Sequence, residues 1–138
     1  MAIDDLISRD WVLLPGTLCT GEVFSPMLDA LGVAASRRRE IVIGDPDPSD
    51  YQGALSAVSG GAVICGFSLG AIVAAHLADR LPAHRLFLFG LNPYPDDPAK
   101  AEGRREFAAE VHAQGGADAL ARRLPPLNGP DPERARAT

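Results

Sequence analysis

The chain has 138 residues, of which 46% are hydrophobic and 22% charged, and its formal net charge is −5. This length and composition are those of a globular protein with a substantial buried core. Because the net charge is negative and no long run of one sign occurs, we expect no binding to nucleic acid or to an anionic membrane surface.

The sequence also limits compartment and cofactors. Cys19 and Cys65 are too few for a disulfide framework, and Cys65 is predicted to be a small buried residue at the end of a strand. Residues 1–10 are short, mixed and acidic, unlike a signal peptide. No apolar run reaches the ~18 residues that a membrane-spanning helix requires. We therefore expect a cytoplasmic protein with no metal and no cofactor.

Strands and helices are predicted to alternate from the start of the chain. After a short leader over residues 1–10, the compact apolar run at 11–14 predicts a buried strand. Apolar spacing predicts a helix over 22–31, which Pro26 allows if it occupies the first helical position, and Gly32 is expected to end it.

A second strand is predicted over 40–43, and the basic cluster Arg37-Arg38-Arg39 before it is interpreted as a solvated loop. Ser49 or Asp50 is expected to cap the next helix. The remaining elements of this part are helices at 49–58 and 71–78 and strands at 62–65 and 85–91. The alternation predicts an α/β protein with three layers and a mostly parallel sheet of about four strands.

The pattern changes after residue 91. A proline-rich loop at 92–98 leads into predicted helices over 99–114 and 117–124, with Phe107 and Val111 as a thin apolar stripe. Another proline-rich loop follows, and 133–138 reads as the start of a further helix. We predict a core over residues 1–95 and a separate, incomplete helical segment over residues 96–138.

The stretch Gly66-Phe67-Ser68-Leu69-Gly70 lies between the strand predicted at 62–65 and the helix predicted at 71–78. In this context G-x-S-x-G is typical of a nucleophile elbow, a sharp turn that holds a serine in a strained, exposed conformation. Gly66 and Gly70 fit this interpretation because the turn leaves no room for side chains at those positions. The serine would also sit at a helix N-terminus, which favours developing negative charge.

Together these stretches resemble the α/β-hydrolase superfamily, and small esterase-like members most closely, over most of residues 11–138. Leu13 to Cys19 is similar to the strand and loop that carry the oxyanion hole, with Pro15-Gly16 where many members have His-Gly. Residues 66–70 match the elbow, and Leu88 to Asp96 resembles the next strand and the loop into a helical cap. The resemblance implies Ser68 as nucleophile and the backbone N–H groups of Leu69 and Thr17, with Leu18 as second choice, as oxyanion donors.

The catalytic acid and base of that family are not found. Members place both after later strands. His76 should lie ~12 Å along its helix from Ser68. His84 should lie at the opposite end of its strand, ~20 Å away. His112 falls in the cap and is interpreted as a solvated helix residue. Asp96 and Asp97 follow the fourth strand, where some relatives place the acid, but their expected role is to cap the next helix.

The apolar run 86–89 predicts a strand with neighbours on both sides, yet it would form the sheet edge, where it could self-associate or bind a partner chain. We therefore expect a truncated hydrolase, or half of a protein whose other part is a separate chain. The first functional hypothesis is a serine hydrolase acting on a small carboxylic ester, thioester or lactone. The second is a catalytically silent fragment or interaction module. An acyltransferase or accessory thioesterase differs from the first only in its acceptor.

Overall fold

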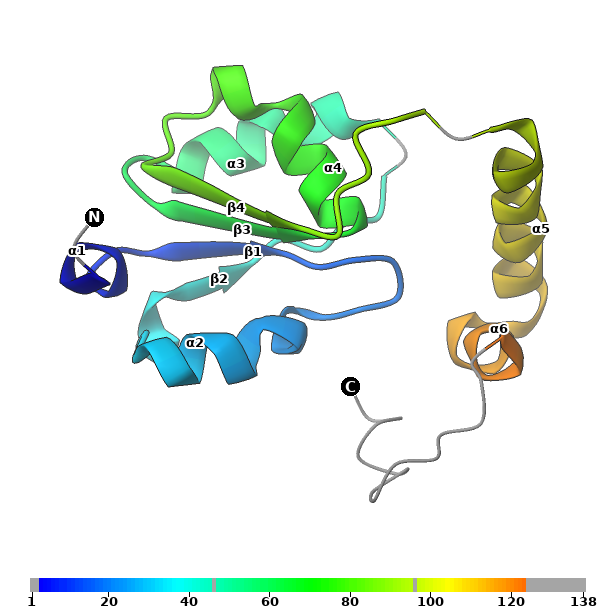
Figure 1. The fold of residues 1–138 in the computed structure, drawn as a ribbon, viewed down its shortest axis with the longest axis horizontal. Helices are drawn as coiled ribbons and strands as arrows, with labels where there is room; N and C mark the ends of the chain where they lie inside the picture. Colours follow the sequence, from blue (N-terminus) through cyan, green and yellow to red (C-terminus); the bar gives the residue numbers. More distant parts are fainter. Residues whose placement is uncertain (1–2, 46, 96, 124–138) are drawn as a thin grey trace. The chain divides into compact units, whose positions relative to one another are not determined.

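The computed structural model describes residues 3–45, 47–95 and 97–123. The chain divides into two compact units, the first ending at Asn92 and the second beginning at Pro93 (Figure 1). Among the described residues, no helix is both long enough and apolar enough to cross a bilayer. That the second unit serves as a cap stays a prediction.

The first unit is built on a parallel four-stranded sheet. Its strands are β1 (Trp11–Leu14), β2 (Arg38–Glu40), β3 (Val63–Phe67) and β4 (Arg85–Phe89). They lie in the order β2-β1-β3-β4, and every neighbouring pair is parallel. Helices lie on both sides of this sheet (Figure 1), which confirms the predicted α/β class.

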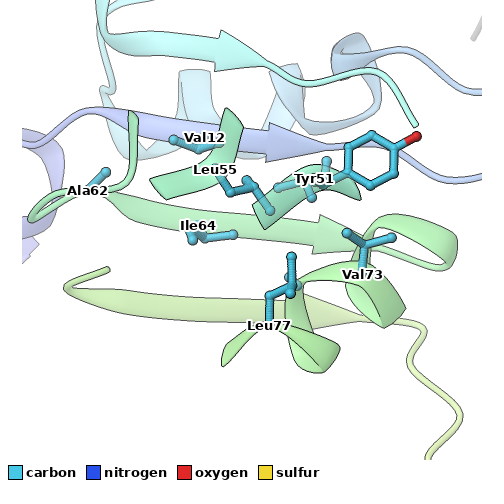
Figure 2. Packing of buried hydrophobic residues seen from close by; sticks show 9 residues of the cluster. Val12, Tyr51, Leu55, Ala62, Ile64, Val73 and Leu77 are labelled. Atoms are coloured by element: carbon cyan, nitrogen blue, oxygen red, sulfur yellow. The ribbon is translucent and has the colours of Figure 1, made fainter. Parts of the chain in front are cut away.

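One face of the sheet is covered by α3 (Gln52–Val58) and α4 (Leu69–His76). Side chains from both helices and from the central strands form a single cluster, seen from close by in Figure 2. Its fully buried members include Val12, Leu55 and Ile64. Since β1 and β3 are buried on both faces, their continuous apolar sequences follow directly from their central position.

The opposite face is covered by α1 (Ile3–Ile7) and α2 (Ser25–Leu31), the latter preceded by the 3-10 turn η1 (Gly21–Phe24). The leader predicted over residues 1–10 is therefore wrong, because residues 3–7 form a short helix. Leu6 explains why: it is buried in this cluster, and its carbonyl accepts a 3.0 Å hydrogen bond from Trp11 Nε1. Trp11 in turn stacks on Phe87, with ring centroids 5.9 Å apart.

Local signals for α2 are confirmed. Pro26 lies in its first turn, where the missing N–H costs no helical hydrogen bond. Gly32 ends the helix in the left-handed region at φ 81°, a conformation that other residues adopt only with strain.

The predicted cap of the next helix is wrong, however. Asp47 takes that role, accepting a 2.9 Å hydrogen bond from the N–H of Ser49 at the start of the 3-10 turn η3 (Pro48–Tyr51).

The strand predicted at 40–43 is displaced, because β2 spans Arg38–Glu40. Pairing with β1 sets this register, since Trp11 lies opposite Arg38. After one further bond, from Ile41 N–H to the Leu13 carbonyl, the chain leaves the sheet. The predicted solvated arginine loop is also wrong in part, because Arg38 lies in the strand and binds Asp29 and the Val33 carbonyl.

Other boundaries shift less. Strand β3 extends through Phe67, so it includes the first two residues of the elbow, and α4 begins at Leu69 and ends at His76 rather than spanning 71–78. Ala71 and Ala74 are buried as the predicted small-residue face requires, whereas Ala78 is exposed. The fourth strand ends at Phe89, and within the described sheet it is an edge strand.

The described part of the second unit contains α5 (Pro98–Gln114) and α6 (Gly116–Arg123). Asp97 caps α5, accepting a 2.8 Å hydrogen bond from Lys100 N–H, as expected. Arg123 binds Glu110 and lies 4.7 Å from the centre of the Phe107 ring. Its hydrogen bond lowers the pKa of Glu110. The predicted loop after residue 124 and the helix at 133–138 lie outside the described residues.

Replacing Leu55 should test the core of the first unit. Leu55→Ala removes a side chain with 0% exposure from the cluster under α3, and we expect it to lower the free energy of unfolding by about 2–5 kcal/mol. Val42→Ala is the control, because Val42 is 69% exposed and should change stability by less than about 0.5 kcal/mol. Urea unfolding, followed by the fluorescence of Trp11, the one tryptophan, would measure the free energy of unfolding of both variants. Equal destabilisation by the two substitutions would contradict the described packing.

Candidate active site

Ser68 stands at the turn between β3 and α4 with a backbone conformation of φ 51°, ψ −112°. Among described residues other than glycine, only Leu18 also has a positive φ. Such a conformation costs on the order of 1–3 kcal/mol and persists only where its surroundings impose it. Here the Ser68 N–H donates a 2.9 Å hydrogen bond to the Phe89 carbonyl, and the Ser68 carbonyl accepts one of 3.1 Å from Ile72 N–H. Ser68 is thus held from both sides.

The two glycines of the elbow are enforced by close backbone contacts. A Cβ atom on Gly70 would lie 2.0 Å from the Leu14 carbonyl oxygen, and one on Gly66 would lie 2.8 Å from the Ala71 Cα. Both contacts are with backbone, which cannot move aside as a flexible side chain could. The first turn of α4 therefore presses directly on β1.

The loop after β1 lies against the serine. A Cβ atom on Gly16 would be 3.2 Å from the Ser68 Cβ and 3.0 Å from a ring carbon of Phe67. Gly90, which follows β4, approaches the same ring, since a Cβ there would lie 3.5 Å from it. The carboxyl ends of three neighbouring strands thus meet around Ser68, which is where ligands bind in open parallel α/β sheets.

Both predicted oxyanion donors adjoin this contact. Leu69 is the first residue of α4, so its N–H has no intrahelical acceptor. Thr17 follows Gly16 in an exposed turn closed by a 3.1 Å hydrogen bond from Cys19 N–H to the Gly16 carbonyl. Within the described residues, neither the Thr17 nor the Leu69 N–H donates to another backbone carbonyl. Their role as an oxyanion hole stays a prediction.

The two histidines of the first unit, His76 and His84, lie away from Ser68. His76 is exposed at the far end of α4. His84 precedes β4, and its Nε2 lies 3.1 Å from Asp5 Oδ2 on α1. The pKa of Asp5 is lowered, first by its hydrogen bond from Arg9 and further by the neighbouring His84. His112 belongs to the second unit, on α5.

No catalytic acid is identified among the described residues. Asp97 caps α5, and Asp96 lies outside the described residues. Asp45 follows β2 and lines a hollow of about 270 Å³, whose other described lining residues are Ile43, Gly44, Pro48, Leu69, Ile72 and Val73. No group of three or more potential metal ligands occurs in the described residues either.

Tyr51 shapes that hollow, and sequence reasoning missed it. Its ring is buried in the core, and Figure 2 shows its hydroxyl directed toward the loop after β2. The hydroxyl oxygen accepts hydrogen bonds of 2.7 Å and 2.5 Å from the N–H groups of Gly44 and Asp45. A tyrosine beginning a helix carries no pattern that indicates such a contact, because the partner loop is set only by the fold.

Comparison of the chain with protein-family models, with curated proteins and with solved structures finds no match.

Substituting Gly70 should disrupt the elbow selectively. Gly70→Ala places a methyl group on the Leu14 carbonyl, and we expect a loss of at least about 3 kcal/mol in unfolding free energy, because backbone must move. Gly53→Ala is the matched control on α3: a Cβ there has nothing within 4 Å, and it should stabilise by about 0.5–1 kcal/mol. Urea unfolding measures the free energy of unfolding of both variants. A Gly70→Ala variant as stable as the wild-type chain would contradict the close contact between Gly70 and the Leu14 carbonyl.

The two thiols should differ in reactivity. Burial of Cys65 in β3 raises its pKa to about 12, because desolvation disfavours the thiolate. Cys19 is half-buried in the loop after β1. At pH 8 we expect Ellman's reagent to modify Cys19 in the native chain and Cys65 only after unfolding in urea. A Cys19→Ser variant isolates Cys65; rapid native labelling of that variant would contradict the burial of β3.

Proposed function

We propose that this chain carries the nucleophilic site of a serine hydrolase of the α/β-hydrolase type, acting on a small carboxylic ester, thioester or lactone. The observation that carries the proposal is the backbone of Ser68, at φ 51° between a buried strand and a helix. Strain of this kind is stored at functional sites. In this proposal residues 1–95 form the three-layer core of a partial hydrolase fold, and residues 96–138 belong to its helical cap.

The proposed chemistry divides one hydrolysis into two transfers. Ser68 Oγ attacks the carbonyl carbon and passes its proton to a general base, while the carbonyl oxygen becomes an oxyanion. The N–H groups of Leu69 and Thr17 would stabilise that oxyanion, and losing one such donor typically costs about 2.7–4 kcal/mol in the barrier. Collapse expels the alcohol or thiol, which takes the proton from the base. Water then releases the acyl group from Ser68 by the reverse sequence.

The position of Ser68 supports this chemistry in two ways. The helix that begins at Leu69 directs its free N–H groups and the positive end of its dipole at the turn. The loop at Gly16 reaches the serine from the neighbouring strand, so donors from two segments can flank one oxygen. An incidental serine in a turn would need neither feature.

The alternative is a catalytically silent fragment or interaction module, and the position of the histidines favours it. His84 is engaged with Asp5 at the start of β4, and His76 lies one helix length from Ser68. The base must reach within about 3.2 Å of the serine oxygen. The hydrolase proposal therefore requires a base from outside the described residues of the first unit. The silent alternative would use the exposed edge of β4 for self-association or a partner chain.

Covalent labelling distinguishes the two functions. The chain is incubated with a fluorophosphonate probe and with p-nitrophenyl acetate, and Ser68→Ala is the control. Under the hydrolase proposal we expect stoichiometric labelling and steady turnover, both lost in Ser68→Ala. Intact mass measurement and release of p-nitrophenol provide the readouts.

Folding of both samples is verified by the fluorescence of buried Trp11. Labelling with turnover would eliminate the silent alternative. A folded chain that neither labels nor turns over would eliminate catalysis by this chain.

A further inference from the structure

The hollow beside the elbow has the size and lining of a site for a short chain. Five apolar residues line it, Ile43, Pro48, Leu69, Ile72 and Val73, and Asp45 is its one charged residue among those described. Its volume of about 270 Å³ lies just below the usual range for sites that hold drug-sized ligands. At ~30 Å³ per water molecule it corresponds to roughly nine waters, enough for a few methylene groups.

One wall of the hollow is fixed in advance of any ligand. The loop at Gly44 and Asp45 is tied through two N–H groups to the hydroxyl of Tyr51. Tyr51 itself is only 6% exposed and packs in the core cluster. The opposite wall is the first two turns of α4, whose start is fixed by the hydrogen bond between Ile72 N–H and the Ser68 carbonyl. Hydrogen bonds therefore hold both walls in place.

Leu69 connects the hollow to the serine. It is one of the residues that line the hollow, and it carries one of the two proposed oxyanion N–H groups. Ser68 precedes it, and consecutive Cα atoms are about 3.8 Å apart. A carbonyl group held at the Leu69 N–H can thus extend a short substituent over this residue into the hollow. Ile72, which is 40% exposed on the same wall, would be covered by that substituent.

We propose that this hollow is the acyl-binding site, selecting esters of short, uncharged aliphatic acids of about four carbons. The selection among esters rests on the proposed function of Ser68. The binding of the short chain rests only on the residues that line the hollow. Apolar walls favour methylene groups, and the Asp45 carboxylate disfavours an acyl group that ends in a second carboxylate. Burying two methylene groups more than acetate should raise kcat/KM roughly 15-fold.

The test compares p-nitrophenyl acetate with p-nitrophenyl butyrate. In the wild-type chain we expect the butyrate-to-acetate ratio of kcat/KM to be roughly 15. Ile72→Trp fills the hollow and should bring this ratio to about one. His76→Trp is the matched control, because His76 is exposed on the same helix but absent from the described lining, and it should retain the wild-type ratio. An unchanged ratio in a folded Ile72→Trp variant would overturn the inference.

A binding experiment separates this inference from the proposed function. Methyl NMR of the wild-type chain is recorded with butyramide and with acetamide, neutral analogues that need no catalysis. If neither ester is hydrolysed, catalysis by this chain is eliminated, but shifts of the Ile72 and Val73 methyl signals with butyramide alone would still support the short-chain site. Equal responses to both amides, or none, would overturn it. Circular dichroism verifies that each variant folds.

Discussion

The contact between the backbone of β1 and the first turn of α4 constrains the rest of the first unit. A side chain at Gly70 would occupy the position of the Leu14 carbonyl, so the helix can start there only as glycine. This approach leaves the chain too little room for a gradual turn, and Ser68 takes the strain as a positive φ. The same closeness brings the loop at Gly16 against the serine. The strain at Ser68, which is half-buried, and the N–H groups beside it both follow from this one close approach.

The two core clusters supply the free energy that maintains this strained turn. Strands β1 and β3 are buried from both sides, with helices α3 and α4 on one face and α1 and α2 on the other. Each fully buried aliphatic side chain contributes about 1.5–3 kcal/mol, comparable to the cost of the strained residue itself. Strand β4 differs, because none of its five residues is fully buried. Its carbonyl at Phe89 nevertheless anchors the Ser68 N–H, so even the edge strand contributes to the elbow.

Much of this architecture could be predicted because it depends on local chemistry. The apolar runs at β1 and β3 and the paired glycines around Ser68 predict the strands and the elbow. Boundaries set by neighbours could not be found: β2 follows its register with β1, and α1 forms because Leu6 is covered by Trp11. The hollow depends on the Tyr51 hydroxyl reaching a loop earlier in the chain, which no sequence spacing encodes. Within the described first unit, His84 contacts Asp5 and His76 lies at the far end of α4, so neither histidine acts as the base of Ser68.

The central claim is that the fold holds Ser68 as a nucleophile facing two backbone donors. A crystal structure of the chain after reaction with diisopropyl fluorophosphate tests it most directly. The account predicts phosphorus bonded to Ser68 Oγ, a positive φ at Ser68, and the phosphoryl oxygen about 2.7–3.1 Å from the N–H groups of Leu69 and Thr17. An unmodified Ser68 with an ordinary negative φ, or a phosphoryl oxygen directed away from both N–H groups, would contradict it.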